Sequence, residues 1–306
     1  MWGNDWDKNA SVKWLSVNHE TNAYDDPNLN FFSPNLVRIN AHPLVTKRGD
    51  ATVRALQRRH LYRYLASTEA IEIEMVNPAL MFVMDSDIAR ETINDAYRVY
   101  TDEGFHALMC VNLRKSLADD GEIPYELRYR NSAMDAVMSM CRTANPEDNR
   151  LILLAIACVN ETMIASSLSQ ATDKSVYPAL RNIVLAHARD EAAHNTYFSN
   201  LMVAFWPRLS DRERTLLTDL MPRIFTDLNL SDRTGVEGDL RAEGFSKEDI
   251  DAIGGEIFTD KVDFDGMRRV ANSSLRMLSR SGFWKDPRAV EGFRAAGLGE
   301  LIADQV

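Results

Sequence analysis

The stretch His187-Ala-Arg-Asp-Glu-Ala-Ala-His194 decides the fold of this chain. His187, Glu191 and His194 are separated by four and then three residues. At about 100° per residue, their side chains fall within an arc of roughly 60° on one face of a helix. Apolar residues such as Leu180 and Phe198 extend the same face in both directions. A charged group in an apolar stripe is costly to bury, so this pattern indicates a partner or a metal.

The core of this motif occurs a second time, earlier in the chain. Glu103-Gly-Phe-His106 and Glu191-Ala-Ala-His194 are both Glu-x-x-His, and each follows an aspartate, Asp102 or Asp190. With six histidines and 45 acidic residues among 306, chance gives about 0.9 matches to acid-x-x-His but only about 0.13 to acid-acid-x-x-His. Two matches to the longer pattern therefore indicate a site.

Two further glutamates complete a repeated unit. Glu161 lies 30 residues before Glu191, and Glu72 lies 31 residues before Glu103. Each falls on the predicted helix that precedes a Glu-x-x-His helix. Glu72 shares a face with apolar residues, and Glu69 remains the alternative on the same helix. The chain thus repeats a helix with a glutamate followed by a helix with Asp-Glu-x-x-His.

Apolar residues at spacings of three and four predict a chain that is helical nearly throughout. The capping box Ser210-Asp-Arg-Glu213 and the pair Asn145-Pro146 mark two helix starts. We expect helices over 51–84, 86–118, 147–171, 175–206, 210–229, 246–256, 262–282 and 287–303, and a polar connection with some helical character over 119–145. The prediction is an all-α single domain, 1–306, comprising an irregular N-terminal wrap over 1–50, a four-helix core over 51–206 and accessory helices over 207–306.

This arrangement matches the design of ferritin-like di-iron and di-manganese proteins, in which two helices give a glutamate each and two others a Glu-x-x-His each. Four carboxylates offset most of the charge of two divalent ions, and mixed carboxylate and imidazole ligands suit iron and O2 better than structural zinc. The six candidate ligands are Glu72, Glu103, His106, Glu161, Glu191 and His194. Asp102 and Asp190 are expected to hold the ligand imidazoles in one tautomer, unless they form solvated charge pairs instead. The alternative explanation for the whole set of candidate ligands is a helical scaffold with incidental buried ion pairs.

His187 breaks the repeat, because its counterpart in the first half is the apolar Val99. A single histidine on an apolar face is commonly a core residue. Here it lies one turn from a candidate ligand, so we interpret His187 as a seventh ligand.

The sequence at this point resembles the non-haem di-iron N-oxygenases of the p-aminobenzoate N-oxygenase type. The resemblance covers about residues 55–205 and rests on Glu72-Ile-Glu-Met-Val-Asn-Pro78, Asp102-Glu-Gly-Phe-His106, Glu161-Thr162 and the motif from His187 to His194. It implies His187 as the additional ligand, two iron ions per chain, O2 as co-substrate and an external electron donor such as a ferredoxin or a reductase. The implied reaction converts a small-molecule amine to a hydroxylamine, nitroso or nitro product in natural-product biosynthesis.

The substrate is less well defined by the sequence. Seven candidate pocket residues lie one or two turns from the ligands: Tyr64, Thr68, Met75, Phe105, Asn160, Ile164 and Tyr197. For each of them, packing in the core explains the position equally well. Family members that act on aminobenzoates hold the carboxylate with a basic side chain, whereas the stretch Tyr64-Leu-Ala-Ser67-Thr68 contains no arginine. A smaller or aliphatic amine therefore stays open, as do a ferritin-like C–H hydroxylase, a radical generator and a non-enzymatic iron-binding bundle.

Composition excludes several other classes of protein. The chain is 45% hydrophobic and 26% charged, with a net charge of −10 and no basic block, so neither nucleic acid nor an anionic membrane surface is an expected partner. The longest apolar run, Leu151–Val159, is too short to span a bilayer. Three cysteines without a CxxC pair and the lack of an export signal lead us to expect a cytoplasmic protein. We also expect a homodimer.

Overall fold

The computed structural model describes residues 6–11, 13, 26–118, 129–170, 173–258 and 264–305. Every regular element in these ranges is a helix, and the sole β-bridge joins Asn30 to Val176. The all-α prediction is confirmed. Residues 1–5, 12 and 14–25 of the predicted N-terminal wrap lie outside the described residues, as do 119–128 of the predicted connection, residue 171 of one predicted helix and 262–263 of another.

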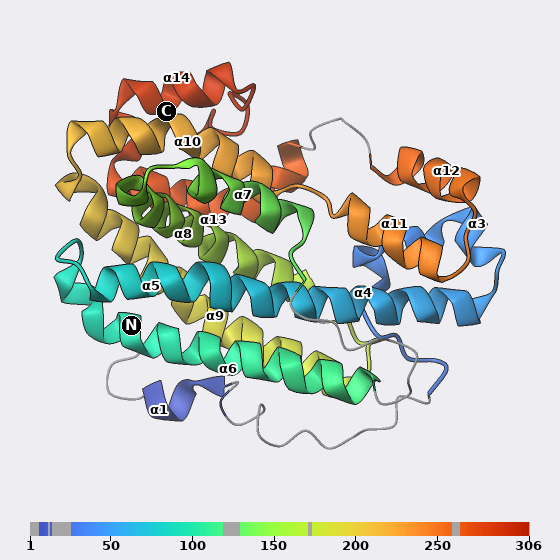
Figure 1. Ribbon diagram of the computed structural model, residues 1–306. Helices are drawn as coiled ribbons and strands as arrows, with labels where there is room; N and C mark the ends of the chain where they lie inside the picture. Colours follow the sequence, from blue (N-terminus) through green and yellow to red (C-terminus); the bar gives the residue numbers. More distant parts are fainter. Residues whose placement is uncertain are drawn as a thin grey trace.

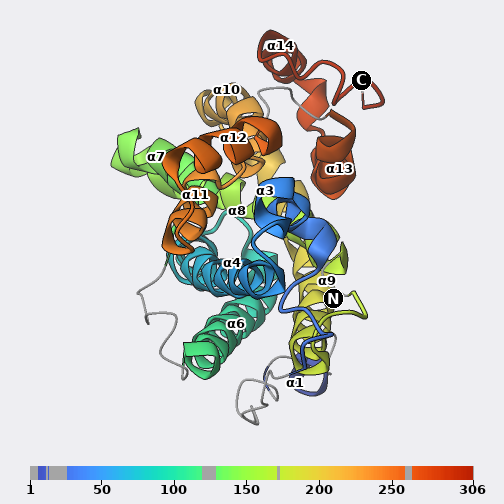
Figure 2. The ribbon, with the colours of Figure 1, turned by 90° about the vertical axis from the view of Figure 1, so that its right-hand side faces the viewer.

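Four long helical segments form the core of the molecule, close to the predicted ranges. The first is α4 (Asp50–Ile71), continued by a π-helical turn (Glu72–Val76) and α5 (Asn77–Met84); the others are α6 (Ile93–Ala118), α8 (Pro146–Gln170) and α9 (Pro178–Phe205). The α4–α5 segment packs along α6, and α8 packs along α9. Figure 1 shows α4, α5 and α6 as two long rods side by side, and Figure 2 shows how α8 and α9 complete the bundle.

Shorter helices surround this core: α1 (Trp6–Asn9), α3 (Pro43–Thr46), α7 (Ser132–Thr143), α10 (Asp211–Leu228), α11 (Arg233–Ala242), α12 (Lys247–Ile257), α13 (Phe264–Ser281) and α14 (Pro287–Ala295). Helix α13 packs against α8 and α9, and α10 packs against α7, α8 and α14. Helices α11 and α12 lie beside α3 and the start of α4, at the end of the molecule away from α5 (Figure 1).

Local sequence explains most helix boundaries. The capping box at Ser210 and Glu213 forms as predicted and starts α10. Helix α6 begins at Ile93 rather than 86, because residues 86–92 form turns and a short 3-10 helix in which the Thr92 hydroxyl donates to the Ala89 carbonyl. Helix α14 stops at Ala295 rather than 303, and Gly297 follows it with a φ of 76°, in the left-handed region that ends helices.

The apolar interior divides into two clusters with a polar layer between them. Along α9, the side chains up to Ala186 belong to one cluster and those from Tyr197 onward to the other. Along α6, the same division falls between Val99 and Met109. The predicted ligands of both helices lie in these gaps. In the described part of the chain, no helix is long and apolar enough to cross a membrane.

Candidate metal centre

All seven predicted ligands meet in the polar layer at the middle of the bundle. None exposes more than 2% of its surface. Their donor atoms form three overlapping groups, within each of which the atoms lie no more than 4.8 Å apart. The groups are Glu72, His106, His187 and Glu191; Glu103, His106, Glu191 and His194; and Glu72, Glu103 and Glu161. Each predicted ligand belongs to at least one group.

A π-helical turn places Glu72 in this centre. Asn77 donates its backbone N–H to the Glu72 carbonyl, five residues back, which widens the helix by one residue at this point. The turn runs directly into Pro78, which has no N–H to continue regular α-helical bonding. Glu69, the alternative ligand, instead forms an ion pair with the buried Arg114. The fold thus brings Glu72 and not Glu69 to the centre.

Two imidazoles present the same nitrogen to the centre. His106 Nδ1 lies 2.7 Å from Glu103 Oε2 and 3.3 Å from Glu191 Oε1. His194 Nδ1 lies 3.0 Å from Glu103 Oε1 and 3.5 Å from Glu191 Oε1. Glutamates from both Glu-x-x-His motifs therefore face both of these histidines, which is the arrangement needed to share two metal ions between the helices.

The outer nitrogens of the same rings face the two aspartates, and the pairs are crossed. His194 Nε2 lies 3.4 Å from Asp102 Oδ2, and His106 Nε2 lies 3.6 Å from Asp190 Oδ2. Both aspartates are buried. Each aspartate thus lies beside the histidine of the other motif, a pairing that spacing along one helix cannot indicate.

His187 also lies in the centre, although it has no counterpart on α6. Its Nε2 is 3.0 Å from Glu191 Oε1, and its ring centroid is 4.2 Å from that of His106. It therefore extends the cluster by one more neutral donor on the α9 side.

Burial and mutual repulsion set the charges of the four glutamates in the metal-free protein. Burial raises the pKa of Glu72 well above its usual value, and Glu103 and Glu161 raise it further. The pKa of Glu161 rises for the same reasons, burial first and then Glu191. Burial is also the largest single influence on Glu103 and Glu191, but the neighbouring histidines together outweigh it. His194 and His106 lower the pKa of Glu103, and His194 and His187 lower that of Glu191.

The pKa values of the three histidines are also shifted in different directions. Burial alone would lower the pKa of His106, yet Glu103 and Asp190 overcome it and raise the pKa to about 9. Glu103 and Glu191 likewise raise the pKa of His194 well above its usual value against the effect of burial. Burial and the neighbouring His106 lower the pKa of His187. The pKa is therefore raised for two carboxyls and two imidazoles of the centre and lowered for the other two carboxyls and the third imidazole.

Several buried acceptors in this centre are unsatisfied, which tests its fit for metal. Within the described residues, neither carboxylate oxygen of Glu72 or Glu191 has a hydrogen-bond partner of acceptable geometry, and neither does Oε1 of Glu103 or Oε2 of Glu161. A buried acceptor without a donor costs about 1–3 kcal/mol, so these six oxygens around one point are unfavourable as they stand. Divalent ions would satisfy these oxygens, and four carboxylates would offset the charge of two such ions. The residues fit a pair of metal ions.

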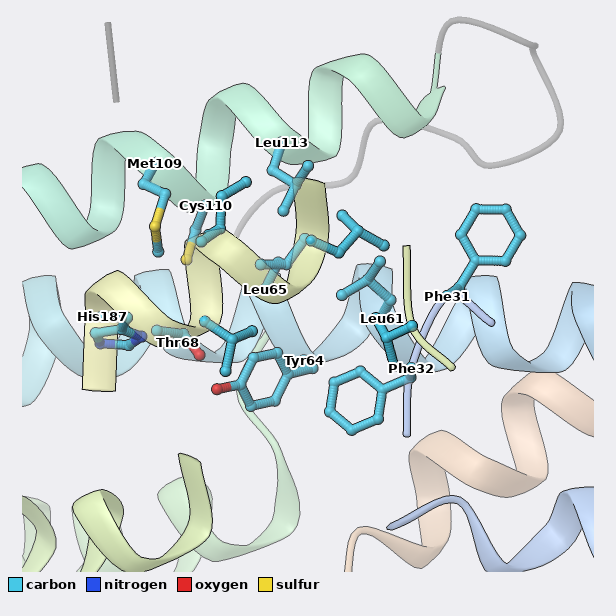
Figure 3. Close-up of a pocket in the computed structure, with 14 residues that line it drawn as sticks. Phe31, Phe32, Leu61, Tyr64, Leu65, Thr68, Met109, Cys110, Leu113 and His187 are labelled. Atoms are coloured by element: carbon cyan, nitrogen blue, oxygen red, sulfur yellow. The ribbon is translucent and has the colours of Figure 1, made fainter. Parts of the chain in front are cut away.

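A narrow apolar cavity reaches the centre at His187 (Figure 3). Fourteen residues line it, drawn from α4, α6, α9, the segment around Phe31 and Phe32, and Val176 just before α9. Of the predicted pocket residues, Tyr64 and Thr68 lie on its wall, and the Tyr64 hydroxyl points toward Thr68. Its free volume is about 20 Å³, enough for one water molecule.

The other predicted pocket residues do not line this cavity. Met75 and Tyr197 are buried in the larger apolar cluster, and Phe105 packs against the smaller one. Asn160 donates to Glu161 Oε1 at 2.9 Å. Ile164 is half-buried. Sequence reasoning missed most of the lining because Met109, Leu113 and similar residues look like ordinary core residues until the cavity is seen.

Polar residues of α13 that the sequence did not single out brace two ligand helices. Asn195, next to His194, donates to the Thr162 carbonyl at 3.0 Å and to the Ser273 hydroxyl at 2.9 Å. The Ser274 hydroxyl lies 2.7 Å from that of Thr162, which follows Glu161. Small polar residues on an amphipathic helix are too common to have marked these positions in advance.

A helical bundle with four carboxylates and three imidazoles gathered in a buried layer defines the class of ferritin-like proteins with a di-metal centre. The family model described as p-aminobenzoate N-oxygenase AurF matches residues 5–231. The chain belongs to this family, and the resemblance read from its motifs is confirmed. It is therefore an enzyme of the di-iron N-oxygenase type, which oxygenates amines. No curated protein gives a match to the chain.

Proposed function

We propose that this enzyme oxygenates the nitrogen of a small arylamine, with O2 as co-substrate, at two irons held by the seven buried ligands. The observation that supports the proposal best is the double position of His187. It belongs to the cluster of donor atoms and also forms part of the cavity wall. An amine in the cavity would therefore lie directly beside the metal ligands.

The residues around the cavity suggest specific roles in the proposed oxygenation. Two irons bound here would supply the redox chemistry that activates O2. The apolar wall, including Leu61 and Leu65, would keep water away from the reacting nitrogen. Tyr64 and Thr68 offer hydroxyl groups near His187 and would orient the amino group by hydrogen bonds. His187 would give one metal position an additional neutral donor and make the two positions inequivalent.

The lining also favours a particular kind of arylamine. The fourteen described residues around the cavity include no lysine or arginine. A carboxylate placed there would lose its hydration without a counter-charge, which is strongly unfavourable. We therefore propose a substrate without a carboxylate, and we expect Tyr64 or Phe32 to move when it binds, because the free volume holds only a water molecule. An external one-electron donor, such as a ferredoxin or a reductase, and a place in natural-product biosynthesis complete the proposal.

Metal analysis and product analysis test this function together. Wild-type protein reconstituted with Fe(II) should hold about two irons per chain. With reductant and O2, it should convert uncharged arylamines to N-oxygenated products faster than 4-aminobenzoate, as measured by mass spectrometry of an amine panel. His187→Ala should reduce iron content and turnover at least tenfold. His42→Ala is the matched control, because His42 pairs with Glu256 away from the centre.

The alternatives give different results in the same experiment. Oxygenation at carbon would favour a C–H hydroxylase. Iron binding without amine-dependent O2 consumption would favour an iron-binding bundle. An unchanged iron content and turnover in His187→Ala would remove His187 from the ligand set, and preferred turnover of 4-aminobenzoate would overturn the proposed substrate class.

A further inference from the structure

A short N-terminal segment contacts both of the aspartates that face the metal ligands. The indole Nε1–H of Trp6, in α1, donates to the two carboxylate oxygens of Asp102 at 3.1 and 3.0 Å. The backbone N–H of Ser11 donates to Asp190 Oδ1 at 2.8 Å. These contacts join residues 96 and 179 positions apart in the sequence. Helix α1 accordingly lies against the outer side of the bundle near α6 and α9 (Figures 1 and 2).

Each contact continues inward to a predicted ligand. Asp102 Oδ2 lies 3.4 Å from His194 Nε2, and Asp190 Oδ2 lies 3.6 Å from His106 Nε2. Trp6 and Ser11, five positions apart in the sequence, therefore begin two parallel connections, one from Trp6 to His194 and one from Ser11 to His106. Both connections end on the imidazoles that present Nδ1 to the centre.

The burial of the aspartates makes these outer donors important. Asp102 exposes 2% and Asp190 3% of their surfaces, so little water reaches either carboxylate. A carboxylate that faces an imidazole N–H fixes the orientation and tautomer of the ring only as well as it is itself held. The Trp6 indole spans both oxygens of Asp102, which prevents the carboxylate from rotating about its terminal bond. Trp6 is half-buried and remains at the outer edge of this connection.

We propose that Trp6 is a positioning residue for the metal centre, acting through Asp102 on His194, and that the Ser11 amide acts in the same way through Asp190 on His106. The segment Trp6–Ser11 is then a third layer of the centre, outside the ligands and the aspartates. The proposal rests on the proposed function, because it requires His194 and His106 to be metal ligands.

The test uses Trp6→Phe, which keeps an aromatic ring and removes only the indole N–H. Its matched control is Trp284→Phe, which removes an indole N–H bonded to the exposed Ser279 hydroxyl at 3.1 Å. Iron loss from the Fe(II)-loaded full-length protein to a colorimetric chelator should be about three- to tenfold faster in Trp6→Phe than in wild type, since substitution of such outer partners weakens metal binding by one to two orders of magnitude at most. The visible ligand-field bands of the Co(II)-loaded protein should also shift. Trp284→Phe should match wild type in both measurements.

A double-mutant cycle with Asp102→Asn separates positioning from packing. If Trp6 acts through Asp102, Trp6→Phe should have no additional effect on iron loss in the Asp102→Asn background. An equal effect in both backgrounds would overturn the proposal, as would wild-type iron loss and Co(II) bands in Trp6→Phe. Wild-type protein that binds no iron would instead contradict the proposed function itself, so the two failures are distinguishable.

Discussion

Burial raises the pKa of Glu72 and Glu161 in the centre, whereas the pKa of Glu103 and Glu191 is lowered beside His106 and His194, whose own pKa values are raised. Protons on the groups with raised pKa values would take the place of the positive charge that two metal ions would bring. Metal and protons then compete for the same oxygen and nitrogen atoms.

This competition predicts proton release when metal binds. At pH 7 each of four groups with a raised pKa, Glu72, Glu161, His106 and His194, should give up its proton to the incoming ions, or about four protons per chain. The release can be measured by titrating apoprotein with Fe(II) without O2 in weak buffer with a pH indicator. Metal affinity should fall as the pH is lowered. Glu72→Gln should release about one proton fewer, and a release near zero in wild type would contradict the assignment.

His60 predicts a second dependence on pH that is independent of the metal. Its ring lies edge-on to Phe32, with centroids 4.8 Å apart, and burial together with Arg63 lowers its pKa from 6.5 to about 3. Between these values the unfolded chain binds a proton that the folded protein does not. The His60 contribution to stability is therefore complete above pH 6.5 and is lost as the pH falls toward 3, by up to about 1.4 kcal/mol per pH unit.

The measurement is the free energy of unfolding by denaturant at several pH values between 7 and 4, for wild type and His60→Phe. Subtracting the two curves isolates His60 from the metal ligands, which titrate in both proteins. Wild type should lose more stability than His60→Phe on acidification. Parallel curves would show that His60 is readily protonated in the folded protein.

At the level of single residues, the sequence predicted which side chains gather in the centre, because helical periodicity fixes the face of each ligand. It could not predict that Asp102 lies beside His194 rather than beside the histidine of its own motif. That pairing depends on how α6 and α9 pack against each other. The spacing of residues within one helix carries no information about this packing. The π-helical turn at Glu72 was equally hidden, although Pro78 marks the place where regular bonding fails.

The packing of helix α11 depends on the small size of one glycine. It carries Gly235 and Gly238, which lower helix propensity and explain why the sequence did not predict it. Gly235 lies against a half-buried polar network in which Arg63 of α4 pairs with Asp232 and Asp239, and the Tyr129 hydroxyl donates to Asp232. This network ties the α11–α12 end of the molecule to the first core helix.

The two glycines provide a matched pair of substitutions. A Cβ on Gly235 would collide with Asp232 and would lie 2.7 Å from Arg63 Cδ and from Tyr129 Oη, whereas a Cβ on Gly238 meets nothing within 4 Å. Gly235→Ala should therefore destabilise the protein by about 1–3 kcal/mol. Gly238→Ala should stabilise it by up to about 1 kcal/mol through helix propensity. Thermal and denaturant unfolding measure both, and equal effects would contradict the close contact.

The long helices were all predicted, as were the shorter α12 and α14, whereas α7 and α11 were not, and helix length is part of the physical reason. A segment such as α9 shows its apolar period over several turns, so its existence does not depend on its surroundings. Helices of about ten residues are marginal alone and form because tertiary contacts select them. Helix α7 illustrates this: Met134, Val137 and Met140 are buried, but the stretch is too short for its period to stand out.

For the molecule as a whole, the C-terminal third is part of the architecture of the centre. The family match ends at residue 231, yet α13 (Phe264–Ser281) bonds through Ser273 and Ser274 to residues adjacent to His194 and Glu161. The accessory helices therefore brace the ligand helices from outside. The sequence predicts one domain with a core over 51–206 and accessory helices over 207–306, and α13 of the accessory part packs directly against α8 and α9 of that core.

This bracing predicts unequal effects of two serine substitutions on α13. Ser274 is fully buried and shares its hydroxyl with Thr162 and with the Val159 carbonyl. Ser274→Ala should lower the free energy of unfolding by about 1–2 kcal/mol. Ser279→Ala, which removes an exposed hydroxyl on the same helix, should change it by less than about 0.5 kcal/mol. Denaturant unfolding of both variants measures the difference, and equal values would argue against a bracing role.

The crossed pairs of Asp102 with His194 and Asp190 with His106 also bear on how such a chain could arise. In a single ancestral hairpin, with one glutamate helix and one Asp-Glu-x-x-His helix, the aspartate would have no histidine of a second motif to orient. Two copies joined as a dimer would orient each other's histidines, so the smallest inheritable functional unit would already be a pair. Fusion of the two copies would then allow each half to change separately, and the two halves of this chain differ at His187, whose counterpart is Val99.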